Sequence, residues 1–532
     1  MSVARSTKGM VASPHALATA AGAAVLRAGG NAVDAAIATN GVLSVVYPQA
    51  NGFGGDAFWM IYDPETADVV TYNGSGRAPR NLEAGDLRER GLSEMPARSG
   101  FAVTVPGAVR AWEDVLEAHG TRMLDALLAP AEQYARDGYV VSQTVAYYLE
   151  LNATILEQCA DAKALFLGRG VPRPGDVLHN PGLAKTIAQV RQGGADAFYE
   201  GSAGEAIVAR LRAAGSPMDG EDLRSHRTQR TTPWRLAWRE GEVLAHPPNS
   251  HGACAQMVLG ALGNERSDDG LWAHMAIEAF KTAFDVRDSR FGDPDFVDLN
   301  ENDIIGPRRL EAMRARIDPE RVTAQFGSPH LPLRTDFGDT IAIVTADADG
   351  QAVSLIQSLY MNFGSGLVAG ESGIVLQNRG AYFNLIAGHP NELHGGHRPV
   401  HTLAPAMYLR KGKPELVYGT MGGDGQPQIH VQILRGVFDR DLDVQAAVDA
   451  PRWIAGRPHV PGREDVMTDT VVVESRMPDA IVDGLTRRGH VVERLGAYDH
   501  TMGHAQAIRI DHTQGTFSGG ADPRADSLAL GV

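Results

Sequence analysis

Cysteine is scarce in this sequence. Cys159 and Cys254 are the only two among 532 residues. Two cysteines are too few for a disulfide framework or a thiolate metal site, so we expect each to be a small buried hydrophobic residue. Nothing else in the composition calls for a bound group, and we expect no cofactor.

Long apolar runs and an excess of basic charge are also missing. No stretch of about eighteen apolar residues occurs, and residues 1–8 lack the apolar segment of a signal peptide. Lys and Arg number 49 against 64 Asp and Glu, giving a net charge of −15. We therefore expect a cytoplasmic location, with neither a membrane nor a nucleic acid as partner.

The residues that are present indicate a layered α/β protein. Apolar spacing and breakers predict helices over residues 15–27, 33–43, 130–136, 182–191, 203–212 and 271–287, with Asn31 capping the second. The region from about 108 to 330 is expected to be mainly helical, whereas strands are expected at 58–62 and from Thr340 onward. The strand after Thr340 is apolar on both faces, which predicts a sheet covered on both sides.

Thr340 opens that strand abruptly and is a candidate nucleophile. If the chain is cut before Thr340, the residue carries a hydroxyl and, as a base, its own α-amine, whose pKa is about 8. The turn Asp349-Gly350 predicts a hairpin centred near residue 349, which places residue 340 opposite Ser358. Each of these residues also has a plain structural interpretation, because Thr and Ser are common in strands.

Gly422 and Gly423 precede a predicted helix over residues 429–434. Consecutive glycines before a helix expose backbone N–H groups, which suit an oxyanion. A simple turn into the helix is the alternative interpretation.

Taken together, the sequence resembles the gamma-glutamyltranspeptidase family of N-terminal nucleophile hydrolases. The motifs that carry the resemblance occur in the family's order: residues 10–15, 29–36, 105–107, 197–201, 278–281, 292–294, 339–340, 363–366, 370–374, 450–452 and 521–524. The resemblance implies a four-layer αββα sandwich. It also implies cleavage between Asp339 and Thr340 into a large subunit (1–339) and a small subunit (340–532) that together form one compact unit.

The resemblance also assigns roles to site residues. It makes Thr340 the nucleophile, Ser358 the second hydroxyl, and Gly422 and Gly423 the oxyanion donors. The family positions that hold the substrate ammonium group are occupied here by Tyr360, Arg379 and Tyr382. The positions of the family's paired serines are occupied by His401 and Thr402. The family's carboxylate-binding Arg aligns with Ser75, and Arg77 two residues later is a possible substitute.

These departures favour a substrate other than glutathione. A cationic Arg379 is a poor partner for an ammonium group but binds a carboxylate well; Arg379 in an internal salt bridge is the alternative. We expect a self-cleaving threonine amidohydrolase acting on a small carboxylate-bearing amide, resembling oxamate amidohydrolases or cephalosporin acylases. A γ-glutamyl hydrolase or transferase and an inactive ligand-binding homologue are the alternatives.

His389, His394, His397 and His401 are spaced in a way that raises the question of a metal. Gly395, Gly396 and Pro399 interrupt any helix there. We therefore expect no metal site and interpret these histidines as loop residues.

Overall fold

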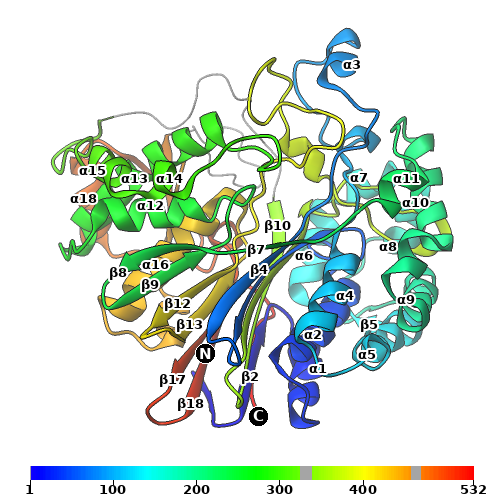
Figure 1. The fold of residues 1–532 in the computed structure, drawn as a ribbon, viewed down its shortest axis with the longest axis horizontal. Coiled ribbons are helices and arrows are strands. Elements are labelled where there is room, and N and C mark those ends of the chain that lie inside the picture. Colours follow the sequence, from blue (N-terminus) through cyan, green and yellow to red (C-terminus); the bar gives the residue numbers. More distant parts are fainter. Residues whose placement is uncertain (1, 324–337, 457–468) are drawn as a thin grey trace.

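The computed structural model describes residues 2–323, 338–456 and 469–532. Within these ranges, two antiparallel seven-stranded sheets lie face to face, and helices cover the outer face of each (Figure 1). This arrangement confirms the predicted αββα fold. No described helix combines the length and the apolar character that crossing a membrane requires.

The first sheet is built around one hairpin. Its strands lie in the order β19 (Leu528–Gly531), β2 (Gly9–Ser13), β10 (Gly338–Asp347), β11 (Ala352–Met361), β3 (Asp56–Asp63), β4 (Asp68–Gly74) and β7 (Gln229–Thr231). From Ile341↔Gln357 to Ala346↔Ala352, β10 and β11 pair in the register that the turn at 349–350 predicts. The central position of this hairpin buries both of its faces.

The second sheet packs against the first. Its order is β1 (Ala4–Ser6), β18 (Thr516–Ala521), β17 (Ala505–Asp511), β13 (Lys413–Thr420), β12 (Ala406–Arg410), β9 (Gly241–Ala245) and β8 (Trp234–Trp238). A side chain at Gly419 would meet Ala342 and Ile356 of the first sheet, so glycine there permits the close approach of β13 to the hairpin. Both sheets combine strands from before and after residue 340.

Helices α1 (Ala16–Arg27), α2 (Ala32–Val46), α4 (Ala108–His119), α5 (Leu124–Asp137) and α9 (Pro181–Tyr199) form the layer outside the first sheet (Figure 1). Helices α12 (Ala253–Leu262), α13 (Asp269–Arg290), α16 (Gln426–Phe438), α17 (Val444–Asp449) and α18 (Asp479–Arg487) form the layer outside the second sheet. Asn31 caps α2 through a reciprocal capping box, as predicted. The predicted helices over 130–136, 182–191, 203–212 and 271–287 lie within α5, α9, α10 (Ser202–Ala213) and α13.

Shorter elements complete the described chain. They are α3 (Ala84–Glu89), α6 (Gln143–Leu151), α7 (Ala153–Glu157), α8 (Ala160–Leu167), α10 (Ser202–Ala213), α11 (Gly220–Arg224), α14 (Glu301–Ile305), α15 (Pro307–Arg314), β5 (Tyr139–Val140), β6 (Val177–Leu178), β14 (Trp453–Ala455), β15 (Thr470–Glu474) and β16 (Val491–Leu495).

Alternation along the strands produces three apolar cores. On β10, Ile341 and Ile343 join the core beneath the first helical layer, whereas Val344 joins the core between the sheets. A third core lies beneath the second helical layer. Cys159 and Cys254 are both free and buried in these cores, as expected.

Two sequence predictions need correction. The described part of the region 108–330 is mainly helical, as predicted, but it also supplies the short strands β5 to β9, which were not predicted. The alternation of Trp234, Leu236 and Trp238 with Arg235 and Ala237 is a strand signal, but five residues are too few to stand out among helices. The strand of Thr340 also begins earlier than predicted, at Gly338.

Candidate active site

Thr340 lies in a row of polar side chains that crosses three strands. The register of β10 and β11 shifts between Asp339 and Ile341, so Thr340 sits at a β-bulge, a feature that re-aims side chains next to active sites. Its Oγ1 donates a hydrogen bond of 3.1 Å to Ser358 Oγ, and both residues are buried. Ser358 pairs in turn with Asp56 on β3. The predicted pairing of Thr340 with Ser358 is therefore present.

The backbone beside this row is strained. Tyr360, which pairs with Asp339 across from the bulge, has φ of 76°, which is unusual for a residue with a side chain. Its N–H donates to Ser358 Oγ at 2.7 Å. The Ser358 hydroxyl oxygen thus accepts hydrogen bonds from both the Thr340 hydroxyl and the backbone N–H of Tyr360 near the end of β11.

Asp56 continues the row, and the sequence analysis did not identify it. Its Oδ1 accepts hydrogen bonds from Gly76 N at 3.0 Å and Gly107 N at 3.3 Å. Burial raises the pKa of Asp56 to about 7, against the opposing positive charge of Arg379. The available signal was a carboxylate at the first position of a strand, directly after the Gly54-Gly55 turn.

His401 reaches Asp56 from the loop that precedes β12. Its Nε2 lies 3.2 Å from Asp56 Oδ2, and its Nδ1 accepts a long hydrogen bond of 3.4 Å from Leu403 N. That pattern assigns the ring proton to Nε2, which donates to the carboxyl group. Burial lowers the pKa of His401 well below its usual value, and the positive charge of Arg379 lowers it further.

Arg379 is a buried cation held by the predicted neighbours. It is 1% exposed; its Nη1 donates to Thr402 Oγ1 at 3.1 Å, and its guanidinium lies 4.2 Å from the centre of the Tyr360 ring. The Tyr360 and Tyr382 rings meet edge to face at 5.9 Å. The structure therefore brings Tyr360, Arg379, Tyr382 and Thr402 together, next to the row of Thr340.

Asp424 adds a second carboxylate that the sequence analysis left unassigned. Its Oδ1 accepts a hydrogen bond from the Tyr382 hydroxyl at 3.0 Å and lies 2.9 Å from Arg287 Nη1. Although burial works against the Arg287 cation, the charges of Asp288 and Asp424 raise its pKa well above the usual value. The Tyr382 hydroxyl is thus tied to an ion pair that no local sequence pattern reveals.

Gly422 and Gly423 connect β13 to the N-terminus of α16. Their φ values are 145° and 51°, conformations that favour glycine. The short 3₁₀ turn Gly423–Gly425 lies against β10, and the N–H of Gly425 bonds to the Gly422 carbonyl at 2.8 Å. The glycine pair and the helix N-terminus are therefore placed beside the strand that carries Thr340.

Arg77 makes its contacts elsewhere. Its Nη1 bonds to Asp293 at 2.9 Å and to the Gly396 carbonyl at 2.7 Å, and its Nη2 pairs with Asp295. With these partners, Arg77 serves a charged cluster rather than the Thr340 row. The buried Arg398, which the sequence analysis missed, joins the same acids and also acts on the charge of Asp56.

The other histidines of the 389–401 loop have separate partners. His389 bonds to the Asp288 carbonyl, His394 to Glu83, and the His397 ring stacks on Phe296 at 3.7 Å. Each of these contacts fits the predicted role of a loop residue.

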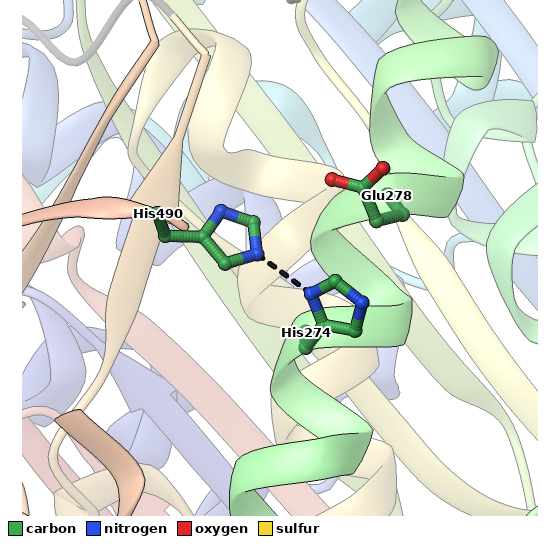
Figure 2. Close-up of side chains that lie close together, drawn as sticks. All are labelled: His274, Glu278 and His490. Atoms are coloured by element: carbon green, nitrogen blue, oxygen red, sulfur yellow. Dashed lines mark hydrogen bonds between the residues drawn. The ribbon is translucent and has the colours of Figure 1, made fainter. Parts of the chain in front are cut away.

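His274, Glu278 and His490 form a tighter cluster away from Thr340, shown in Figure 2. His274 Nδ1 lies 2.8 Å from His490 Nε2, a separation bridged by one proton, and His274 Nε2 bonds to the Asp318 carbonyl. The Lys281 ammonium lies 2.5 Å from one Glu278 oxygen, and Thr323 donates to the other. The Lys281 ammonium thus supplies the positive charge that a metal ion would bring to Glu278. Hydrogen bonds from the cluster anchor residues 318–323 to α13.

Comparison with known proteins identifies the family of this chain. The family model described as gamma-glutamyltranspeptidase matches residues 18–532. The glutathione hydrolase-like YwrD proenzyme of Bacillus subtilis is 39% identical over 533 residues, covering 99% of each chain. The oxamate amidohydrolase proenzyme of Klebsiella pneumoniae is 35% identical over 538 residues, with the same coverage.

A solved structure shows the same fold over the whole chain. Cephalosporin acylase from Bacillus halodurans superposes with a TM-score of 0.91 at 33% identity, covering 100% of this chain and 97% of that one. The chain therefore belongs to the gamma-glutamyltranspeptidase family and is an amidohydrolase of the N-terminal nucleophile type.

Proposed function

We propose that this protein is a self-cleaving threonine amidohydrolase that acts on small amides bearing a carboxylate next to the scissile carbonyl. The observation that carries the proposal is the Thr340–Ser358 hydrogen bond of 3.1 Å beside the buried guanidinium of Arg379. The first feature supports a nucleophile, and the second supports an anionic substrate group.

The first step is cleavage of the chain. The Thr340 hydroxyl attacks the Asp339 carbonyl carbon, the C–N bond between the two residues breaks, and an ester forms on Thr340 Oγ1. Water then hydrolyses the ester, which leaves the Asp339 carboxylate and the free α-amine of Thr340. Residues 1–339 and 340–532 become the two subunits.

The second step is turnover. The α-amine accepts the hydroxyl proton as Thr340 Oγ1 attacks the substrate carbonyl. The N–H groups of Gly422 and Gly423 stabilise the oxyanion, and the proton passes to the departing amine. Water completes the cycle by releasing the acyl group as a carboxylate. No cofactor enters this scheme.

Arg379 is the better candidate for the substrate carboxylate. Arg77 is already paired with two acids, so a substrate would have to displace them. Arg379 donates to the Thr402 hydroxyl, lies over the Tyr360 ring and acts on the charge of Asp56, and its planar guanidinium suits charge-assisted hydrogen bonds to a carboxylate. His401, Tyr382 and Thr402 complete the walls around this group.

The second candidate is a γ-glutamyl hydrolase or transferase, which the YwrD-like relative's designation favours. Such a substrate needs an acid for its ammonium group. Among the side chains that the structure describes, the carboxylates of Asp56 and Asp424 lie near cations: the charge of Arg379 acts on Asp56, and Asp424 pairs with Arg287. This arrangement favours the carboxylate-bearing amide.

Gel electrophoresis of the purified protein tests the cleavage step. The expected result is two fragments of 339 and 193 residues, the latter from 532 minus 339. Thr340→Ala should remain whole, and Thr340→Ser should still cleave. A single undivided band after long incubation of the wild type would leave an inactive homologue as the remaining interpretation.

Ammonia release tests the substrate. Oxamate and glutamine should be compared with a γ-glutamyl anilide, whose product is measured separately. We expect oxamate or a similar carboxylate-bearing amide to be turned over fastest. Turnover of the anilide alone would establish the γ-glutamyl activity instead.

A further inference from the structure

Asp56 places an acidic group near Arg379, the proposed receptor of the substrate carboxylate. Asp56 and His401 are both buried and 3.2 Å apart, and Arg379 donates to Thr402, the residue after His401. The charge of Arg379 acts on both members of the pair. A buried cation that already has an acid beside it attracts a second anion less strongly. The charge of the Asp56–His401 pair therefore affects what Arg379 can bind.

The pair changes its net charge by gaining one proton. With Nε2–H of His401 donating to an ionised Asp56, the pair carries one negative charge. One further proton makes it neutral, whether the proton resides on the carboxyl or on the ring, because two groups in contact titrate together. Burial, which raises the pKa of Asp56 to about 7, places this change near neutral pH.

Among the described side chains, the other ionisable groups around the pair keep their charge in that range. Arg379 and Arg398 face Asp56, and Tyr199 senses its charge; burial raises the pKa of Tyr199 above its usual value. His246 and His251 face His401, and burial lowers their pKa values to about 4 and 3. Both are neutral at pH 7, so the Asp56–His401 pair is the one among these groups that changes.

We propose that the Asp56–His401 pair competes with the substrate carboxylate for Arg379, so that a carboxylate-bearing ligand binds together with one proton from solvent. The inference rests on the proposed function in taking Arg379 as the receptor of the substrate carboxylate. It adds a specificity rule: carboxylate-bearing amides bind best below neutral pH, whereas a neutral amide of the same shape binds independently of the pair.

Calorimetry on the wild-type protein tests this inference without turnover. The probe is oxalate, the product of oxamate hydrolysis, which has no amide to cleave. Titration at pH 7.5 in buffers of different ionisation enthalpy measures proton uptake. We expect uptake of close to one proton, and affinity that falls by about tenfold per pH unit once the pair is ionised.

Two variants identify the group that takes up the proton. Asp56→Asn should bind oxalate more tightly at pH 8 than the wild type, with no proton uptake and little dependence on pH. Glu113→Gln removes a carboxyl on α4 whose pKa burial also raises, and it should leave uptake unchanged. Gel electrophoresis of both variants records whether they fold and cleave.

The outcomes separate this inference from the proposed function. Oxalate binding with proton uptake, in a protein that hydrolyses no carboxylate-bearing amide, upholds the inference and overturns the proposed substrate. Binding without uptake in the wild type overturns the inference, whatever the variants do. Failure of oxalate to bind at any pH overturns it as well, because Arg379 then has no carboxylate to compete for.

Discussion

Arg379 shows how one buried side chain constrains the chemistry around it. Removing a guanidinium from water costs several kcal/mol unless strong partners replace the solvent. In the structure, its surroundings include a threonine hydroxyl, an aromatic face and the charge of a neighbouring acid. A cationic side chain in these surroundings supports the proposal that the position binds a planar anion, not the ammonium group that the family motif serves here.

Arg379→Ala should weaken the reaction of carboxylate-bearing amides by about 2 kcal/mol or more in kcat/KM, about thirtyfold, because a desolvated charge pair is lost. Arg379→Lys keeps the charge without the planar fork and should retain part of the activity. Steady-state kinetics with oxamate and with a neutral isostere measures the effect. Equal losses for both substrates would show that Arg379 is structural.

Ser358→Ala removes the oxygen that accepts from both the Thr340 hydroxyl and Tyr360 N. We expect slower cleavage of the chain and slower turnover, by about 10- to 100-fold, because the nucleophile loses its orientation. A time course on gels and an ammonia assay report the two steps. Ser354→Ala is the matched control, since Ser354 lies on the same strand but bonds to the Tyr418 carbonyl; cleavage at the wild-type rate in Ser358→Ala would contradict the assignment.

At the scale of elements, the loop from Met421 to Gly425 depends on a second loop behind it. Gly503 has φ of 77°, and a side chain there would meet the Met421 carbonyl and Ile429 at 2.4 Å. Arg452 fixes this support by donating to the carbonyls of Met502 and Gly503. The proposed oxyanion donors are therefore positioned from outside their own loop.

Gly503→Ala should lower kcat by about tenfold or more while changing KM little, because the added methyl group shifts Gly422 and not the substrate pocket. Gly515→Ala provides the control: it has a similar φ of 64° but open space around it. Comparing kcat for the two variants separates the effect of displacing the Met421–Gly425 loop from the effect of placing alanine at a positive φ. An unchanged kcat in Gly503→Ala would show that the loop does not need this support.

The elements also explain which parts the sequence alone could predict. The pairing of Thr340 with Ser358 was predictable because a short turn fixes the register of both strands. Asp56, Asp424 and Arg398 were not, because each acquires its role from partners more than 40 residues away in the chain. The pairing of Arg77 with acids of the 293–295 segment was not predictable for the same reason.

At the scale of the whole molecule, one buried ion-pair network joins the second sheet to its helices. Arg452 and Arg524 both bind Asp522 at the end of β18, and Arg524 also binds Glu474 at the end of β15. The two arginines also donate to carbonyls at the end of α17. Loss of one member leaves a buried charge without its partner, which typically costs about 3–5 kcal/mol.

Asp522→Asn should therefore lower the melting temperature markedly, whereas Asp479→Asn, in an exposed pair with Arg494, should change it little. Although burial opposes it, the charges of Arg452 and Arg524 lower the pKa of Asp522 to about 2. Its stabilising contribution is present above about pH 4 and is lost as pH falls toward 2. Thermal melts from pH 2 to 7 should show that the variant loses less stability on acidification than the wild type. An identical acid dependence in both proteins would remove Asp522 from this role.

Asp56 acts in the opposite direction. Its pKa is raised to about 7, so between pH 4 and 7 the unfolded chain releases this proton before the folded protein does. Its contribution to stability therefore decreases as pH rises through that range. The opposite contributions of Asp522 and Asp56 to the free energy of unfolding together favour a stability maximum below pH 7.

The shared sheets give the proposed cleavage a kinetic consequence. β10 and β11 lie between β2 and β3, so strands from both sides of residue 340 alternate within one sheet. Unfolding an intact chain keeps all strands tethered, and refolding is first order. Unfolding the cleaved protein releases two separate chains, and their reassembly depends on concentration. The cleaved enzyme would then persist because it unfolds slowly. Efficient folding would occur only once, in the uncleaved precursor.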